Sequence, residues 1–225
     1  MKAFSSDFER KQEINLPEFS NTRIMMMPIM LGDTNSIPSF LDGWKPALES
    51  MFEMQDHNEK VGYLTIDEKI VAAGSTHRRA GKHVDGIYKN AAGGWGGGGG
   101  GWGGGIEPTP GLDMQKSTGM LTVSSTSGCK AWKQIFNGWP DDEGSCDHLS
   151  SQCKEKESEI FSANTVYWVD ALCVHESMEM ERDTKRQFVR LSLPSTAPWF
   201  EGYTENPLGI LPTGDILERR DFMSM

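Results

Sequence analysis

The stretch "VGYLTIDEKIVAAG" (residues 61–74) decides the fold, because from here the chain consists of short segments rich in β-branched and aromatic residues. Such residues favour half-buried strands. Three later segments share this character: "GMLTVSST" (119–126), "NTVYWVDALCVHES" (164–177) and "RQFVRLSLP" (186–194). Long helices do not alternate regularly with them, which argues against a parallel sheet of βαβ units. We therefore predict a mainly β fold with helical cover (α+β), built as an antiparallel double-sheet barrel.

The 225 residues fit a single domain around this core. Residues 1–60 are expected to combine an irregular lead-in, a buried strand near "RIMMMPIM" (23–30) and helical segments that cover the sheet. We assign the strand-rich core to 61–195 and a C-terminal tail to 196–225.

Composition narrows the class of partner. The formal net charge is −10, and no long run of Lys and Arg interrupts it. Because an acidic surface repels phosphate backbones, we expect a small-molecule or peptide substrate and no nucleic acid. The longest apolar run, "IMMMPIML" (24–31), is too short to cross a membrane, and the N-terminus lacks an apolar signal region. We expect a cytoplasmic protein with free cysteine thiols. The oligomeric state does not follow from the sequence.

A glycine-rich insertion, "AAGGWGGGGGGWGGG" (91–105), interrupts the core. Ordering such a segment costs much backbone entropy, so one interpretation is a surface loop without a fixed conformation. The other is a lid over a substrate, with Tyr88, Trp95 and Trp102 as contacts. Both interpretations are compatible with the sequence.

The segment "GKHVDG" (81–86) carries a candidate metal-binding pair. On a strand, His83 and Asp85 would share a face and could converge on one ion. The flanking glycines would let the chain turn closely around a site. His175, on a distant strand segment, supplies a second imidazole. Two histidines and one carboxylate form the facial triad of non-haem Fe(II) oxygenases.

The last strand segment carries a candidate carboxylate clamp. Arg190 and Ser192 are two residues apart and share a face. A guanidinium binds a carboxylate bidentately, and a hydroxyl adds one more donor. Arg186 lies on the same face and is the second choice. The fifteen residues between His175 and Arg190 allow a turn and an antiparallel return strand beside the metal.

Taken together, H-x-D, a distal His and R-x-S resemble the motifs of the 2-oxoglutarate/Fe(II)-dependent dioxygenases, over about residues 60–195. The resemblance implies a double-stranded β-helix, a jelly-roll or cupin-like core. It implies that His83, Asp85 and His175 hold Fe(II). 2-Oxoglutarate would be the cosubstrate, with its far carboxylate on Arg190 and Ser192, and O2 the oxidant. A C–H bond of a substrate that the sequence does not identify would be hydroxylated.

Two other functions stay open. A cupin-like metalloenzyme would use the same ligands without 2-oxoglutarate, and would not need the Arg190–Ser192 clamp. A non-catalytic jelly-roll binding protein would need neither clamp nor metal.

Two further clusters of polar residues stand out. Cys146, His148 and Cys153 lie within eight residues, but their spacing matches no common zinc finger, so a structural zinc is not expected. The basic run 77–79 (His-Arg-Arg), with Lys82, could attract an anionic cosubstrate or substrate. Its alternative is a solvated turn.

Overall fold

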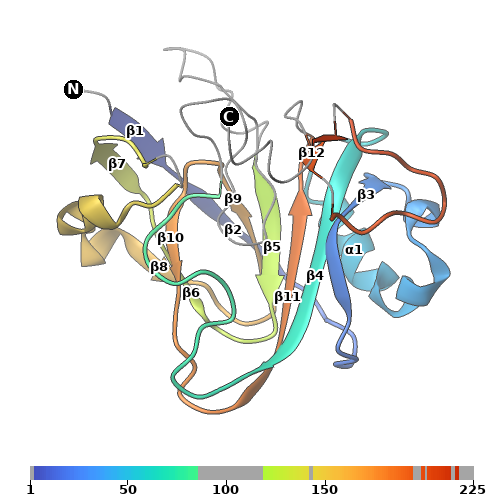
Figure 1. The fold of residues 1–225 in the computed structure, drawn as a ribbon, viewed down its shortest axis with the longest axis horizontal. Helices are drawn as coiled ribbons and strands as arrows, with labels where there is room; N and C mark the ends of the chain where they lie inside the picture. Colours follow the sequence, from blue (N-terminus) through green and yellow to red (C-terminus); the bar gives the residue numbers. More distant parts are fainter. Residues whose placement is uncertain are drawn as a thin grey trace.

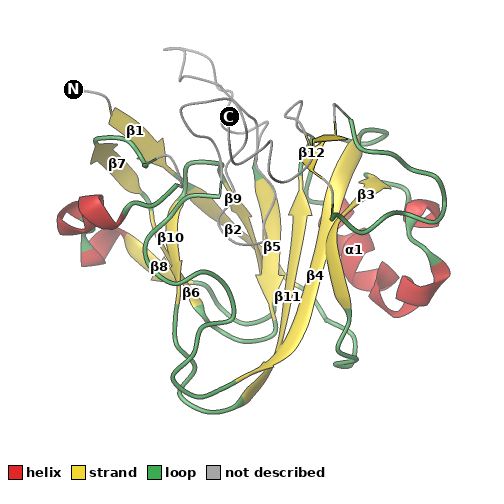
Figure 2. Cartoon of the chain, in the orientation of Figure 1, coloured by secondary structure: helices red, strands yellow, loops and turns green. Residues whose placement is uncertain are grey.

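A computed structural model describes the greater part of the chain: residues 3–85, 119–141, 144–194, 199–200, 202–213 and 216–217. Strands in mainly antiparallel sheets are the main regular structure of these residues, and short helical segments lie at both sides of the molecule (Figures 1 and 2). The mainly β prediction with helical cover is confirmed. The double-stranded β-helix stays a prediction. None of the helices in the described ranges has the length and apolar character needed to span a membrane.

The largest sheet has six strands in the order β2-β9-β5-β11-β4-β3, and each neighbouring pair is antiparallel. Its strands are β2 (Phe8–Glu13), β9 (Thr165–Val169), β5 (Met120–Ser124), β11 (Thr184–Ser192), β4 (Val61–Val71) and β3 (Arg23–Met30). The predicted strands near 23–30, 61–74, 119–126 and 186–194 are therefore confirmed as β3, β4, β5 and β11.

Two smaller antiparallel sheets lie on the side of the molecule opposite α1 (Figure 1). One has three strands, β10 (Val174–Ser177), β6 (Cys129–Trp132) and β8 (Ser158–Ile160), and another pairs β1 (Ala3–Ser6) with β7 (Gln134–Asn137). Two short 3-10 helices, η4 (Asp147–Gln152) and η5 (Glu155–Glu157), precede β8. Near the C-terminus, β12 (Trp199–Phe200) and β13 (Ile216–Leu217) pair in parallel.

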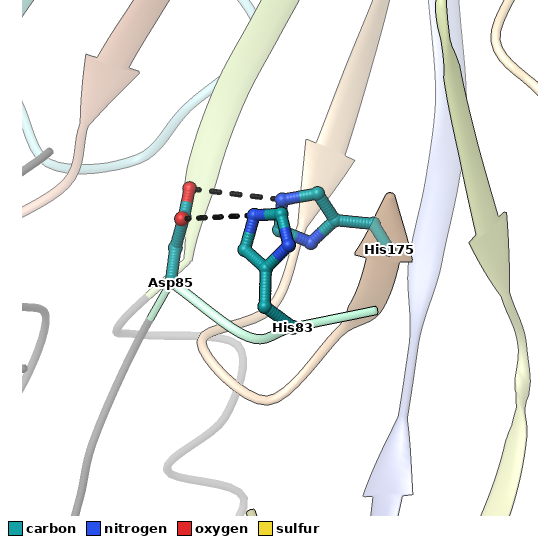
Figure 3. Close-up of side chains that lie close together, drawn as sticks. All are labelled: His83, Asp85 and His175. Carbon is teal, nitrogen blue, oxygen red and sulfur yellow. Dashed lines mark ion pairs between the residues drawn. The ribbon is translucent and has the colours of Figure 1, made fainter. Parts of the chain in front are cut away.

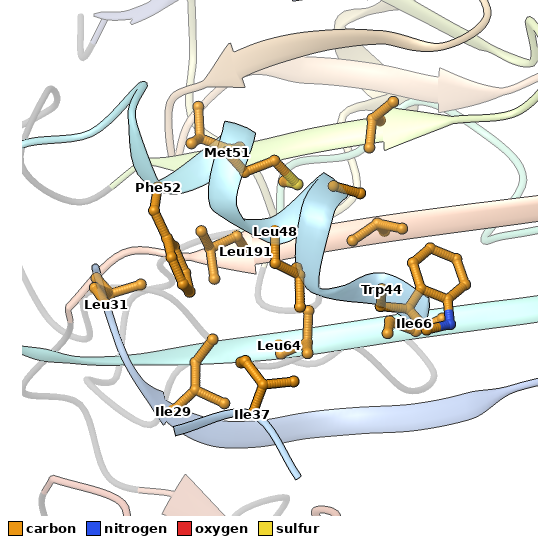
Figure 4. Packing of buried hydrophobic residues seen from close by; sticks show 14 of the residues in the cluster. Ile29, Leu31, Ile37, Trp44, Leu48, Met51, Phe52, Leu64, Ile66 and Leu191 are labelled. Carbon is orange, nitrogen blue, oxygen red and sulfur yellow. The ribbon is translucent and has the colours of Figure 1, made fainter. Parts of the chain in front are cut away.

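The six-stranded sheet has one apolar face and one polar face. Leu64 and Ile66 of β4 and Leu191 of β11 belong to the core cluster, which includes the helical segments (Figure 4). These segments are η2 (Ser39–Trp44) and α1 (Lys45–Phe52), which follow the short helix η1 (Thr34–Ser36). The helix α1 buries Ala47, Leu48, Met51 and Phe52, the spacing of an amphipathic helix. Because side chains alternate along a strand, the residues between the apolar ones point to the opposite face, where the candidate site lies.

The first residues were expected to be irregular, and this prediction is wrong. They form β1 and β2, and β2 is an edge strand of the six-stranded sheet. Its sequence, "FERKQE", buries only Phe8 fully and therefore has no hydrophobic alternation. Charged side chains of this kind protect sheet edges from pairing with other chains, and they hide the strand from pattern analysis.

The segment 164–177 was expected to be a single strand, and this is also wrong. It divides into β9 and β10, which belong to different sheets. At the break, the Asp170 carboxylate accepts the N–H of Leu172 at 2.6 Å, and the Asp170 carbonyl accepts the N–H of Cys173 at 3.2 Å. This side-chain turn is flanked by apolar residues, so the sequence reads as a continuous strand. Tyr167 and His175 consequently do not share one strand face.

Candidate metal centre

A backbone bridge brings the two histidines together. The N–H of His83 donates to the carbonyl of His175, and the N–H of His175 donates to the carbonyl of His83, both at 2.9 Å. Residues that exchange both hydrogen bonds lie directly opposite each other in an antiparallel pair. The imidazole centroids are 4.4 Å apart. His83 thus reaches β10 through an isolated bridge and not as part of a named strand.

Backbone contacts on the other side hold the His83 segment in place. The carbonyl of Lys82 accepts a hydrogen bond from the N–H of Cys146 at 2.7 Å, and the carbonyl of Gly144 accepts one from the N–H of Val84 at 3.0 Å. The turn that leads into the segment passes through Gly81, whose φ of +76° is accessible to glycine at little cost. A Cβ at Gly81 would lie 2.9 Å from a carboxylate oxygen of Asp147. The predicted close turn before His83 is confirmed, whereas Gly86 lies outside the described residues.

Hydrogen bonds orient both imidazoles toward the same carboxylate. Nδ1 of His83 lies 2.8 Å from the carbonyl of Gly81, and Nδ1 of His175 lies 2.9 Å from the carbonyl of Cys173. A carbonyl only accepts, so each Nδ1 carries a proton, and this tautomer directs Nε2 toward the carboxylate. These Nε2 atoms lie 4.0 and 3.9 Å from Oδ1 and Oδ2 of Asp85 (Figure 3).

The charge state of the site suits a cation. Burial, followed by the neighbouring charge of His175, lowers the pKa of His83 to about 4. Burial alone would raise the pKa of Asp85, but His175, Arg190 and His83 lower it well below its usual range. At neutral pH the site therefore presents a neutral His83 imidazole and a carboxylate, the forms that bind metal ions.

The donor atoms fit a metal ion. One ligand atom from each of the three residues lies within 4.8 Å of the others. Metal–ligand bonds of about 2.1 Å in a facial arrangement place donors about 3 Å apart, so side-chain rotation has to shorten separations of at most 4.8 Å by up to about 2 Å. Two imidazoles and one carboxylate suit Fe(II), Zn(II) and similar divalent ions. The convergence of His83, Asp85 and His175 predicted from the sequence is confirmed.

The structure gives Arg190 a different partner from the predicted cosubstrate carboxylate. Its Nη1 donates to Oδ2 of Asp85 at 3.1 Å, and its Nη2 lies 3.2 Å from the sulfur of Met26. The Ser192 hydroxyl also faces this sulfur, at 3.8 Å. Arg190 therefore holds the carboxylate of a candidate metal ligand. Its strand, β11, pairs with β4 and β5 and not with β10, and it lies beside the candidate centre, where Arg190 contacts Asp85.

Arg186, the second choice, has an unused donor group. Its Nε donates to the Ser124 hydroxyl at 2.9 Å, while the buried Nη1 has no hydrogen-bond partner among the described residues. A Cβ at Gly128 would lie 2.8 Å from the guanidinium, so glycine leaves the space that it occupies. A buried donor without a partner is costly, and an anionic ligand would remove this cost.

Two cavities adjoin the centre. The larger has a volume of about 270 Å³ and the smaller about 50 Å³. Both are lined by Asp85, Cys129, His175, Arg186 and Phe188. The smaller one is otherwise mostly apolar, with Met120, Phe161, Tyr167 and Val169 in its wall. Arg186 and the candidate ligands thus face common spaces.

The basic run is not a solvated turn. His77 is buried with Nε2 3.3 Å from Oδ2 of Asp67, and Arg78 donates to the same oxygen at 3.0 Å. Arg78 and Arg79 line the larger cavity. Lys82 instead donates to Glu176 at 3.2 Å.

The cysteine-rich segment is not brought together as a ligand group in the described residues, where His83, Asp85 and His175 form the one such group. His148 contacts the carbonyl of Trp139 through Nε2 at 3.0 Å. Burial raises the pKa of Cys146 to about 12, so its thiol stays protonated at neutral pH. Cys146 acts through its backbone, which supports the His83 segment.

Sequence reasoning missed three charged residues of the larger cavity: Arg23, Asp67 and Lys69. A signal was present for two of them, because Asp67 and Lys69 occupy alternate positions of the strand stretch 61–71 and so share a face. The proposed substrate contacts Tyr88, Trp95 and Trp102, with the insertion 91–105, lie outside the described residues.

No protein-family model, curated protein or solved structure matches this chain, so the site alone supports a function.

Proposed function

We propose that this chain is a non-haem Fe(II)- and 2-oxoglutarate-dependent dioxygenase that hydroxylates a C–H bond of a small molecule or peptide. One observation carries the proposal: two Nε2 atoms and one carboxylate converge, with both Nδ1 atoms bound to backbone carbonyls. Three protein ligands on one side leave coordination positions for a cosubstrate and O2. The two sheets beside the site are compatible with a double-stranded β-helix core, which belongs to the same proposal.

Each residue has a defined part in this proposal. His83 and His175 present fixed lone pairs, and Asp85 supplies the negative charge that a divalent cation needs. Arg190 orients the carboxylate through its hydrogen bond of 3.1 Å. Bound Fe(II) would supply the activation of O2 coupled to the oxidation of 2-oxoglutarate. The protein positions the substrate and excludes water around it.

Within this proposal, Arg186 binds the far carboxylate of 2-oxoglutarate. Its Nη1 is buried and available, and it lines both cavities together with the candidate ligands. Arg190 is less suited, because it already binds Asp85. The Ser124 hydroxyl, which accepts from Nε of Arg186, takes the orienting place that the sequence suggested for Ser192.

Anaerobic titration of the full chain with Fe(II) and then 2-oxoglutarate tests the proposal. We expect a weak visible charge-transfer band after both additions, and slow succinate formation in air. The substitution His175→Ala should abolish metal binding and the band. The variant Arg186→Met should still bind Fe(II) but should no longer bind 2-oxoglutarate. Lys185→Met, a change at the exposed neighbouring position, is the matched control.

The outcomes separate the candidate functions. A chain that binds Fe(II) but not 2-oxoglutarate is a metalloenzyme of the cupin-like kind. A chain that binds neither is a binding protein, and the oxygenase proposal is then wrong.

A further inference from the structure

The larger cavity has a positively charged wall, although the chain as a whole carries a formal charge of −10. The cationic lining residues are Arg23, Lys69, Arg78, Arg79 and Arg186. The acidic lining residues are Asp67 and Asp85, and Asp85 belongs to the metal centre. A concave site lined by one sign of charge concentrates ligands of the opposite sign.

The sheet register explains how these cations gather. Arg23 of β3 lies opposite Asp67 of β4, which lies opposite Phe188 of β11. One step along the same face, Lys69 lies directly opposite Arg186. Like charges in directly opposed positions destabilise a sheet. An anion bound by Lys69 would lessen this repulsion.

One carboxylate serves several of these cations. Nε of Arg23 lies 3.6 Å from Oδ1 of Asp67, and Nη1 of Arg78 lies 3.0 Å from Oδ2. Burial lowers the pKa of His77, so this neighbour adds no charge at neutral pH. Lys69 has no carboxylate within ion-pair distance in the described part of the chain. Three cations and one carboxylate leave two positive charges unbalanced.

The same wall has an apolar part. The guanidinium of Arg78 lies over the ring of Phe188, 5.1 Å from its centroid, and Met25 also lines the cavity. A ligand with both an anionic group and a small apolar body therefore matches the wall better than an inorganic ion does.

We propose that Arg23, Lys69 and Arg78 bind a carboxylate or phosphate group of the small organic substrate that enters the cavity of about 270 Å³. The identification of this ligand as the substrate rests on the proposed function, whereas the anion-binding site does not. The site is distinct from the one assigned to 2-oxoglutarate at Arg186. It narrows the substrate class to small anionic molecules.

Calorimetric titration of the full chain at low ionic strength tests the site with three probes: phenyl phosphate, phenylacetate and the uncharged phenylacetamide. We expect at least one anion to bind and the amide to bind at least tenfold more weakly. Added salt should weaken the binding of the anion, because salt screens the attraction between exposed charges. Preference for phenyl phosphate identifies a phosphoester substrate, and preference for phenylacetate identifies a carboxylic acid.

Three variants locate the binding. The variants Lys69→Met and Arg23→Gln should each bind the anionic probe at least tenfold more weakly than the unmodified chain. The control variant Lys185→Met should bind it with unchanged affinity. Lys69 is half-buried and Arg23 is exposed at the edge strand β3, so neither change should lower the midpoint of thermal unfolding markedly. Equal binding of the amide, or unchanged binding by Lys69→Met, would overturn the proposal. Tighter binding of a single-stranded oligonucleotide than of phenyl phosphate would also overturn it, in favour of a polymer.

A fourth variant separates this proposal from the oxygenase proposal. Arg186→Met should lose 2-oxoglutarate and retain the anionic probe, because the two anions use different residues. If Fe(II) and 2-oxoglutarate do not bind but the probe still depends on Lys69, the oxygenase proposal fails and the anion site stands. If 2-oxoglutarate binds and no probe does, the anion site fails and the oxygenase proposal stands.

Discussion

Arg186 and Arg190 are both buried on the same face of β11, yet they have different partners. Arg190 binds Asp85, and Arg186 binds Ser124 with one nitrogen left over. A buried arginine is costly unless it is paired, so each must be matched to an anion that exists in the folded or the ligand-bound state. The folded chain supplies that anion for Arg190, and we assign the anion of Arg186 to a ligand.

The substitution Arg190→Met tests the positioning of Asp85. We expect at least tenfold weaker metal binding, since loss of a group that orients a ligand commonly costs 10- to 100-fold in affinity. Arg190→Lys should restore part of the affinity by keeping a donor and a charge. Competition titration with a metal-binding dye measures both variants. If Arg190→Met binds the metal as tightly as the unmodified chain, or more tightly, Arg190 does not position Asp85 for metal binding.

Asp170 makes the stability depend on pH. Burial raises its pKa from 3.8 to about 8, against the hydrogen bonds from Leu172 and Cys173. Between these values the folded chain holds a proton that the unfolded chain has lost, so stability falls as the pH rises through this range. Asp170→Asn keeps an oxygen for the N–H of Leu172 and cannot ionise. The variant should therefore lose less stability over this interval.

Urea unfolding at about pH 5 and about pH 9 measures this effect. The exposed Asp56→Asn is the matched control and should follow the unmodified chain. If Asp170→Asn loses as much stability as the control between the two conditions, Asp170 ionises in the folded state at its ordinary pKa.

At the scale of elements, α1 covers the apolar face of the six-stranded sheet. Leu48 at the centre of α1 is completely buried and packs within the same cluster as Leu64 and Leu191 (Figure 4). This contact leaves the opposite face of the sheet free for the polar site. The two faces follow from the alternation along β4 and β11.

The substitution Leu48→Ala should lower the free energy of unfolding by about 2–5 kcal/mol, because it removes buried surface and leaves a cavity. Leu211→Ala, at a position 70% exposed, is the matched control and should change stability by less than about 0.5 kcal/mol. Chemical denaturation measures both. A similar small effect for both variants would mean that α1 is not packed on the sheet in solution.

At the scale of the whole molecule, a bound metal ion connects distant parts of the chain. His83 and Asp85 follow β4, and His175 lies on β10 of a different sheet. A ligand that binds only the folded state stabilises it by about 2.7 kcal/mol at 100 times its dissociation constant. Fe(II) under anaerobic conditions, or Zn(II), should therefore raise the midpoint of thermal unfolding. His175→Ala should show no rise, and the absence of a rise in the unmodified chain would contradict a metal centre.

Most of the strands and the candidate ligands could be predicted from the sequence. Local preferences of β-branched residues identify β3, β4, β5 and β11, and the rarity of histidine makes His83 and His175 easy to find. It did not reveal β2, whose charged edge lacks alternation, or the break at Asp170. Backbone hydrogen bonding to β9 decides β2, and the side-chain turn at Asp170 decides the break; local hydrophobicity reports neither.

Which residues face each other could not be predicted from the sequence. The strand β11 lies between β4 and β5. Arg186 therefore lies opposite Lys69 of β4, and Arg190 donates a hydrogen bond to Asp85. The motif spacing alone favoured Arg190 as the carboxylate clamp, because spacing reports the face of a strand and not its neighbours. Strand order and register depend on contacts between residues far apart in the chain, and these contacts determine which arginine pairs with a carboxylate and which donates to a hydroxyl.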